Sequence, residues 1–266
     1  MTKSIDFSKY SAIRVGPVAE VYLIDSDVYP EDACLIGAAN NLLVGPDHPP
    51  LMKLSKTFDF ISIESGRLRI GAATPGGKIV SFCKKHDIGG LEFLSHLPGT
   101  LGGMLKMNAG MKEYEIFNRL IRLRTKVGWI ERDAIDYGYR RTGLSDVVFE
   151  AEFAIEKGFS TERLELFRQM RANQPSDPSA GSFFKNPPGD YAGRLIESVG
   201  LKGHRIGAMA FSGKHANFMV NLGGGSFEEA MALAELAERK VFEAFGVRLE
   251  REVRVVDRRY MAGTEC

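Results

Sequence analysis

Short apolar runs of strand character, separated by turns rich in glycine, proline and polar residues, fill the first 155 residues of the chain. In the last of these runs Val147, Phe149, Ala151 and Phe153 alternate with other residues, so they share one face, as a half-buried strand requires. We therefore predict a strand-rich first part, with strands at residues 19–25, 67–73, 118–126 and 146–155.

One helix is predicted within this strand-rich part. Thr74 and Pro75 form a plausible cap and first turn, and Ile79, Val80 and Cys83 supply an apolar face at helical spacing. Basic residues then accumulate before a pair of glycines, which is typical of a helix end.

The pattern becomes helical from about Phe159. Ser160 begins a predicted helix that must end before Pro175. Ser226 and the glutamates after it form a capping box for a second helix, which Gly246 ends before a predicted strand at 248–257. The change of pattern predicts an α+β protein with domains at 4–156 and 157–257, followed by a tail at 258–266.

The composition narrows the class of partner. With 266 residues, 44% hydrophobic residues, 26% charged residues and a net charge of +1, the chain can form one large or two modest domains. Such a balance does not favour disorder, a nucleic-acid surface or a membrane span, and the amino terminus lacks an apolar leader. We expect a cytoplasmic monomer that binds small molecules.

The cysteines and histidines indicate no metal site. Cys34, Cys83 and Cys266 have neither CxxC spacing nor an even count, so they favour neither a disulfide framework nor a thiolate metal site. The five histidines form no ligand pair.

Two glycine-rich segments could bring backbone close to a ligand. In 35–44 a small-residue turn between apolar runs could form an anion-binding nest, or simply join two strands. In 97–111 Gly102 and Gly103 remove side chains where a bulky ligand could lie, although a tight helix packed through glycines would look the same. Neither segment matches a dinucleotide-binding or P-loop motif.

Polar residues on predicted strands form further candidates. The segment 212–226 places Lys214 and three other polar groups around a strand, as a ligand site or a solvated hairpin would. Glu252 and Arg254 lie two residues apart and face the same side, as they also would on an exposed, charged edge strand. In the segment PSAGSFFKNP, Ser182 directly precedes two phenylalanines.

The order of these motifs is more specific than any one of them. The series GAANNLL, GLEFLSHLPGTLGG, MNAG, YR, PSAGSFFKNP, GLKGHRIG, KHANFMVN and LEREVRV resembles the UDP-N-acetylenolpyruvoylglucosamine reductase (MurB) family over about residues 11–257. The short interval between Arg140 and Ser182 resembles the shorter, second type of this family.

This resemblance implies a fold and a reaction. The fold would combine an FAD-binding domain of the vanillyl-alcohol-oxidase (PCMH) type with a carboxy-terminal α/β substrate-binding domain. The reaction would be the NADPH-dependent reduction of UDP-N-acetylglucosamine enolpyruvate to UDP-N-acetylmuramate in peptidoglycan precursor synthesis. FAD would be bound non-covalently, and no metal would be needed.

The resemblance also implies roles for individual residues. The catalytic residues would be Ser182, Arg140 and Glu252. The FAD-binding residues would be Gly37, Ala38, Ala39, Asn40, Asn41, Pro98, Gly99, Thr100, Gly102, Gly103, Asn108, Ala109 and Gly110. The sugar nucleotide would contact Tyr139, Lys185, Asn186, Lys214 and Arg254.

The chemistry of this reaction suits these residue types. Hydride addition to the enolpyruvyl double bond leaves negative charge on the neighbouring carbon and its carboxylate. Arg140, a permanent planar cation, suits that carboxylate, and Glu252 could hydrogen-bond the same group. Ser182 could donate the proton, because the acceptor would be a strongly basic carbon.

The chain departs from the family at the first flavin loop, where Ala38 and Ala39 replace glycines and alanine resists a positive φ. Two alternatives stay open: another FAD oxidoreductase of the same fold, and a UDP-sugar-binding protein that has lost its flavin. Flavin absorbance of the purified protein would exclude the second.

Overall fold

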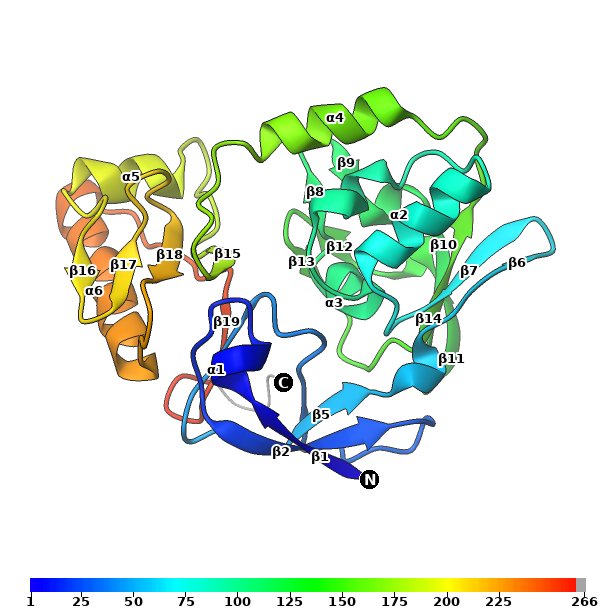
Figure 1. Cartoon of the computed structure of the whole chain (residues 1–266), viewed down its shortest axis with the longest axis horizontal. Coiled ribbons are helices and arrows are strands. Elements are labelled where there is room, and N and C mark those ends of the chain that lie inside the picture. Colours follow the sequence, from blue (N-terminus) through cyan, green and yellow to red (C-terminus); the bar gives the residue numbers. More distant parts are fainter. Residues whose placement is uncertain (262–266) are drawn as a thin grey trace. The chain divides into compact units, whose positions relative to one another are not determined.

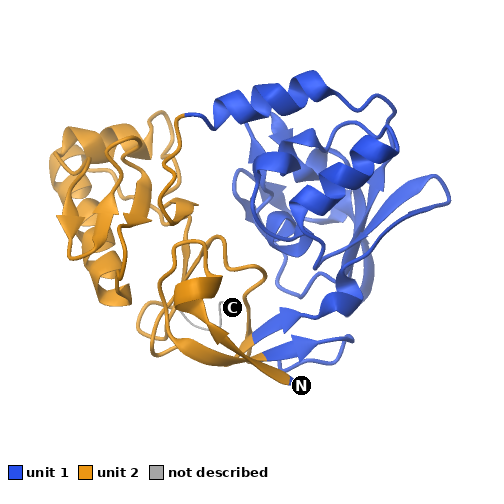
Figure 2. Cartoon of the chain, viewed as in Figure 1, with its two compact units in different colours: residues 1, 22–31, 52–172 blue, residues 2–21, 32–51, 173–266 orange. Residues whose placement is uncertain are grey.

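The structure is a computed structural model, and it describes residues 1–261 (Figure 1). The chain divides into two compact units (Figure 2). The first consists of residues 1, 22–31 and 52–172, and the second of residues 2–21, 32–51 and 173–266. The units are therefore not consecutive segments, in contrast to the expected domains at 4–156 and 157–257.

The first unit is built on an antiparallel sheet of five strands in the order β11-β10-β14-β7-β6. The unit also contains two small hairpins, β8 with β9 and β12 with β13, and three helices. The strands are β6 Ile61–Glu64, β7 Arg67–Gly71, β8 Gly110–Met111, β9 Tyr114–Glu115, β10 Leu120–Thr125, β11 Gly128–Glu131, β12 Tyr137–Gly138, β13 Arg141–Thr142 and β14 Glu150–Ala154, and the helices are α2 Gly76–Lys85, α3 Leu101–Lys106 and α4 Thr161–Met170.

Strand β14 explains why this sheet is stable although it carries many charges. Its predicted apolar face, including Ala151 and Phe153, is buried. The opposite face is also almost closed to solvent, because Glu150 and Glu152 are 2% and 8% exposed. Glu150 pairs with Arg69 and Arg124, and Glu152 with Arg67 and Arg122, so both carboxylates are compensated by arginines of neighbouring strands. The expected half-buried strand is thus buried on both faces.

The second unit contains an antiparallel sheet in the order β15-β18-β17-β16, which packs with α5 and α6 around one apolar core. Because all its strand pairs are antiparallel, this part is α/β only in the loose sense that it mixes helices and strands. The elements are β15 Ser179–Ser182, α5 Ala192–Ser198, β16 Arg205–Ile206, β17 Met209–Phe211, β18 Phe218–Asn221 and α6 Phe227–Phe245.

A further sheet has the order β1-β2-β5-β3, and a parallel pair joins β4 to β19. The division of the chain into units falls within β2 and β5. The remaining elements are β1 Thr2–Asp6, α1 Phe7–Tyr10, β2 Val18–Ile24, β3 Cys34–Leu35, β4 Leu42–Val44, β5 Leu51–Leu54 and β19 Arg254–Val256.

The predicted helix starts are confirmed for α4 and α6 but not for α2. Ser160 caps α4 by accepting from the Arg163 N–H, and the reciprocal capping box of Ser226 begins α6. Helix α2 differs, because Pro75 itself is the N-cap residue and Thr74 instead donates its hydroxyl to the Phe60 carbonyl. The strand expected at 248–257 is also shorter, since only β19 has strand geometry.

The structure changes the expectation for one cysteine. Cys83 is a buried free thiol, but Cys34 is disulfide-bonded, which the odd cysteine count did not indicate. Cys266 lies outside the described residues. Within residues 1–261, none of the helices combines the length and the apolar character needed to cross a bilayer.

Candidate functional site

The predicted site residues fall into two groups, one in each unit. In the first unit, residues 98–106 form a turn and the short helix α3. The N–H groups of Leu101 and Gly102 donate to the carbonyls of Thr74 and Ala72, so this helix start is fixed against the end of β7 and the start of α2. The Thr100 side chain makes no capping hydrogen bond to its own helix.

The two glycines of α3 serve different purposes. A methyl group on Gly102 would lie 3.2 Å from the Ala72 side chain, so this glycine permits close packing. A methyl group on Gly103 would meet no atom within 4 Å. Gly103 is exposed, and no contact among the described residues requires a glycine there, so a ligand could approach this backbone closely.

Asn108 is fully buried and adopts a positive φ of 42°. Its Nδ2 donates to a Glu115 carboxylate oxygen at 2.8 Å and to the Gly138 carbonyl at 3.1 Å, and its Oδ1 accepts from the Phe117 N–H at 3.4 Å. The side chain is thus committed to protein partners. It ties the turn at 108–110 to the hairpin of β12 and β13.

Arg140 forms a second hydrogen bond between the turn at 108–110 and the hairpin of β12 and β13. Its guanidinium donates to the Gly110 carbonyl at 2.7 Å and lies 5.4 Å from the Tyr139 ring. Arg140 occupies the left-handed region at φ +54°, where a non-glycine residue is strained by about 1 kcal/mol or more. The turn Tyr139–Arg140 and the turn at 108–110 therefore fix each other through two reciprocal hydrogen bonds.

In the second unit, the loop at 37–41 is held by its carbonyl groups. The Tyr10 hydroxyl donates to the Gly37 carbonyl at 2.8 Å, and the Ala12 N–H donates to the Ala39 carbonyl at 3.2 Å. Among the described residues, the backbone N–H groups of Gly37, Ala38 and Asn40 have no partner. Such a loop offers donors to an anion.

Ala39 adopts the positive φ that its side chain disfavours, at 51°. Its methyl group is only 1% exposed and packs in an apolar cluster with Ile36 and Leu42. The loop therefore retains a left-handed turn despite the loss of a glycine, at the cost of local strain.

Ser182 ends strand β15 at a break in the ladder. It follows Gly181, which has φ +88°, and the register with β18 shifts between Ser179 and Ser182. Ser182 is partly exposed, and its hydroxyl has no hydrogen-bond partner within the described residues. The phenylalanines that follow are buried and pack edge to face at 5.1 Å.

Glu252 and Arg254 are brought to this serine segment by backbone hydrogen bonds. The Glu252 N–H donates to the Phe183 carbonyl at 2.8 Å, and the Glu252 carbonyl accepts from the Asn41 side chain at 2.9 Å. The Arg254 N–H donates to the Asn41 carbonyl at 3.0 Å. Asn41 of the predicted flavin loop therefore positions the segment 252–254, in which only Arg254 lies on a strand, in contrast to the expected single strand that carries both charged residues.

The other predicted contacts of the sugar nucleotide lie in the same unit. Lys185 forms an ion pair with Glu250, Asn186 accepts from the Ala192 N–H, and Lys214 donates to the Gln174 carbonyl. Lys185 and Asn186 follow the serine segment directly, whereas Lys214 lies in the loop before β18.

Asn217 is one of the polar residues noted at 212–226, but no role was predicted for it, although it binds the serine segment through three hydrogen bonds. It is 3% exposed and lies immediately before β18. Its backbone carbonyl accepts from the Phe183 N–H, and its side chain binds both polar backbone groups of Phe184. The Asn217 N–H in turn donates to Nδ1 of His215, whose pKa is lowered by burial, which favours the neutral ring that can accept. The motif KHANF contained this residue, but only the fold shows its partner.

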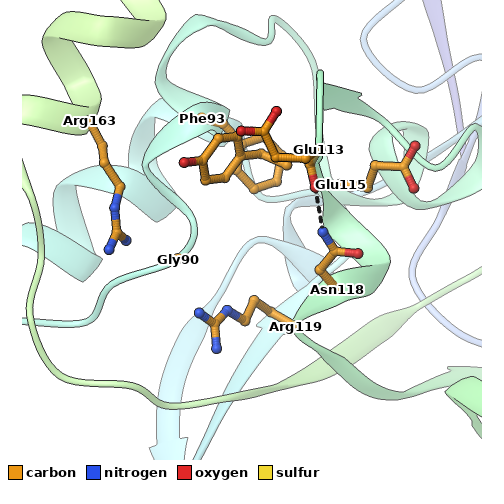
Figure 3. A pocket seen from close by; sticks show the side chains of 8 residues that line it. Gly90, Phe93, Glu113, Glu115, Asn118, Arg119 and Arg163 are labelled. Carbon is orange, nitrogen blue, oxygen red and sulfur yellow. Dashed lines mark hydrogen bonds between the residues drawn. The ribbon is translucent and has the colours of Figure 1, made fainter.

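Neither of two cavities formed by the described residues is lined by a predicted site residue. A cavity of about 310 Å³ in the first unit is lined by residues that include Phe93, Tyr114, Arg119 and Arg163 (Figure 3). Both arginines already have acidic partners, Glu156 and Glu92. Within residues 1–261, no group of three or more metal-ligating side chains is found.

Comparison with known proteins identifies the chain. Residues 174–256 match the model of the UDP-N-acetylenolpyruvoylglucosamine reductase carboxy-terminal domain. Two UDP-N-acetylenolpyruvoylglucosamine reductases, from Helicobacter hepaticus and Campylobacter jejuni, are 45% and 47% identical to this chain. The alignments cover 96% and 95% of this chain and 99% of each relative. The crystal structure of the enzyme (MurB) from Thermus caldophilus aligns with a TM-score of 0.84 at 28% identity, covering 96% of this chain and 98% of that one. The chain therefore belongs to the UDP-N-acetylenolpyruvoylglucosamine reductase family, oxidoreductases also known as UDP-N-acetylmuramate dehydrogenases that act in the synthesis of peptidoglycan precursors.

Proposed function

We propose that this chain catalyses the NADPH-dependent, FAD-mediated reduction of UDP-N-acetylglucosamine enolpyruvate to UDP-N-acetylmuramate. One observation supports this proposal above the others: the Ser182 hydroxyl has no partner among the described residues, and the residue after it is hydrogen-bonded to the backbone of Glu252. With these substrates the enzyme would work in the cytoplasm, and we propose that it is monomeric.

The residues expected to hold FAD fit a nucleotide cofactor. The loop at 37–41 offers backbone donors without partners among the described residues, as a pyrophosphate requires. Gly103 has open space where a methyl group would stand, and Thr100 leaves its helix without a side-chain cap. We propose a PCMH-type FAD-binding domain at 4–156 and a substrate-binding domain at 157–257. These residues would hold FAD non-covalently, and FAD reduced by NADPH would supply the hydride.

Asn108, Ala109 and Gly110 support cofactor binding in a different way from the loop at 37–41. The Asn108 side chain and the Gly110 carbonyl are already engaged with the hairpin of β12 and β13. We therefore propose that these residues, with Pro98 and Gly99, shape the backbone at the cofactor rather than bind it through side chains.

Arg140 binds the carboxylate of the enolpyruvyl group in this proposal. Its guanidinium has five N–H donors, and the bond to the Gly110 carbonyl uses one of them. That bond and the neighbouring Tyr139 ring hold the cation in place before the substrate arrives. A preorganised cation stabilises the negative charge that develops on the carboxylate when hydride adds to the double bond.

Ser182 then donates its proton to the carbon next to the carboxylate. A free hydroxyl is needed, because a serine that donates to a protein acceptor would first have to break that bond. Glu252, placed by its backbone beside the same segment, would hydrogen-bond the reacting carboxylate in its protonated form, since an ionised carboxylate would repel it. Lys185, Asn186, Lys214 and Arg254 bind the sugar nucleotide, and the cations among them suit its diphosphate.

An anaerobic two-step titration tests this function. NADPH should bleach the flavin absorbance of the purified protein, and UDP-N-acetylglucosamine enolpyruvate should restore it with formation of UDP-N-acetylmuramate. A protein without flavin absorbance, or a bleached flavin that the substrate does not reoxidise, would contradict the proposal. Ping-pong kinetics is expected if NADPH and substrate occupy the site in turn.

A further inference from the structure

The backbone just after Ser182 leaves the regular sheet. Phe183 and Phe184 are adjacent in sequence, yet both side chains are buried, at 1% and 0% exposure. Successive side chains of a regular strand point to opposite faces, so two adjacent buried rings in the same apolar core require an irregular backbone. A single antiparallel bridge from Phe184 to Arg251 pairs the Phe183 carbonyl with the Glu252 N–H, so the other polar backbone groups of these two residues need further partners.

Asn217 supplies three of these four partners. The Asn217 backbone carbonyl accepts from the Phe183 N–H at 2.7 Å. Its side-chain Oδ1 accepts from the Phe184 N–H at 3.0 Å, and its Nδ2 donates to the Phe184 carbonyl at 2.7 Å. The fourth group, the Phe183 carbonyl, accepts from the Glu252 N–H. The Asn217 side-chain amide thus takes the place of a neighbouring strand for Phe184, two residues after the serine.

We propose that Asn217 is a positioning residue for the proton transfer, and that its side-chain amide fixes the direction in which the Ser182 hydroxyl points. Ser182 lies between Gly181, which has φ +88° and donates its N–H to the Ser179 hydroxyl, and Phe183, whose N–H and carbonyl bond the backbone of Asn217 and Glu252. The Asn217 side chain holds the next residue, Phe184, so its loss would release the backbone on the carboxy-terminal side of the serine. This inference rests on the proposed function, in which Ser182 is the proton donor.

Asn221 provides a matched control on the same part of the chain. It is 5% exposed, and its side chain also satisfies buried backbone groups on both sides. Its Nδ2 donates to the carbonyls of Ile13 and Arg14, and its Oδ1 accepts from the N–H groups of Gly223 and Gly225. The Asn221 side chain binds no residue of the serine segment, so its loss should cost stability without moving Ser182.

The experiment compares Asn217→Leu with Asn221→Leu in the flavin-containing enzyme. Both variants should melt at lower temperatures than the wild type, because each leaves buried backbone groups without partners. In stopped flow, Asn217→Leu should keep the rate of flavin reduction by NADPH within about twofold and slow reoxidation by the enolpyruvyl substrate by about 10- to 100-fold, as expected for a misplaced reacting group. Asn221→Leu should keep both rates.

A second variant applies if Asn217→Leu does not fold. Asn217→Asp keeps the shape, and its carboxyl can donate to the Phe184 carbonyl only when protonated. Burial should raise the pKa of this carboxyl above the usual value of about 3.9. The reoxidation rate of the variant, relative to the wild type at the same pH, should therefore rise as the pH falls through that pKa, while the reduction rate should show no such trend.

Amide hydrogen exchange gives a readout that does not depend on turnover. In the flavin-free protein, Asn217→Leu should accelerate exchange at Phe184, and Asn221→Leu should not. The inference would be overturned if Asn217→Leu slowed both half-reactions equally, if it slowed neither, or if Asn221→Leu slowed reoxidation as strongly. A wild-type enzyme that the enolpyruvyl substrate does not reoxidise would instead remove the proposed function, and with it this inference.

Discussion

Replacing Asn108 by alanine should destabilise the first unit even when no flavin is present. The resemblance assigns Asn108 to FAD binding, but its side chain is fully buried and bound to Glu115, Gly138 and the Phe117 N–H. If these protein contacts are its main role, the loss should appear in the free energy of unfolding of the apoprotein.

The size of this loss follows from the contacts. A hydrogen bond to a carboxylate contributes about 1.5–3 kcal/mol and a neutral one about 1 kcal/mol, so the bonds to Glu115 and Gly138 together contribute about 3 kcal/mol. Alanine at φ +42° adds about 1–2 kcal/mol of strain that glycine avoids. Asn108→Ala should therefore lose about 4 kcal/mol. Asn108→Gly should lose about 0.5–1 kcal/mol less than Asn108→Ala, because the greater entropy of glycine in the unfolded chain offsets only part of the strain that it avoids.

The assay can report on this unit alone. Trp129 is the only tryptophan of the chain, and it lies on β11 in the sheet of the first unit. Its fluorescence during urea unfolding of the flavin-free protein should follow that unit. A loss below about 1 kcal/mol for Asn108→Ala would refute the structural role, and equal losses for alanine and glycine would refute the strain.

Three further outcomes are expected. Arg140→Ala should weaken binding of the enolpyruvyl substrate and slow reoxidation by about 10²-fold or more, with Arg140→Lys intermediate; a change confined to the NADPH step would contradict this role. Hydrogen bonds from Arg122 lower the pKa of Glu152 below its ordinary 4.5. The ionised Glu152 side chain therefore stabilises the folded protein fully above pH 4.5, and this contribution is lost as the pH falls through the lower pKa of the folded state. Acid unfolding should accordingly depend less steeply on pH in Glu152→Gln than in the wild type, and an unchanged slope would count against the pairing. Burial raises the pKa of the Cys83 thiol to about 12, so it should resist alkylation at pH 8 until the protein unfolds; rapid labelling of Cys83 in the native protein would disprove its burial.

Local signals predicted the helices better than the strands. Ser226 and Glu229 lie within one helical turn, so their capping box was visible in the sequence and is present in the structure. The burial of Glu150 and Glu152 was not predictable, because their arginine partners come from strands distant in sequence. A charged residue every second position ordinarily indicates a solvent-exposed face.

In the candidate site, too, contacts between residues distant in sequence could not be predicted. The order of motifs indicated the family, which the comparisons confirm. It did not indicate that Asn108 binds Gly138 or that Asn217 binds Phe184, since these partners are about thirty residues away and meet only through the fold. Nor did it indicate that Ala39 adopts a left-handed conformation, because its buried methyl group stabilises what its backbone disfavours.

The most direct test of the account is a stopped-flow comparison of the two half-reactions in Ser182→Ala. The account predicts that NADPH reduces the flavin of this variant at the rate of the wild type. Reoxidation by UDP-N-acetylglucosamine enolpyruvate should then be slowed by at least about 10²-fold, because the proton donor is missing. Equal slowing of both half-reactions, or reoxidation at the wild-type rate, would contradict the assignment of Ser182 as the proton donor.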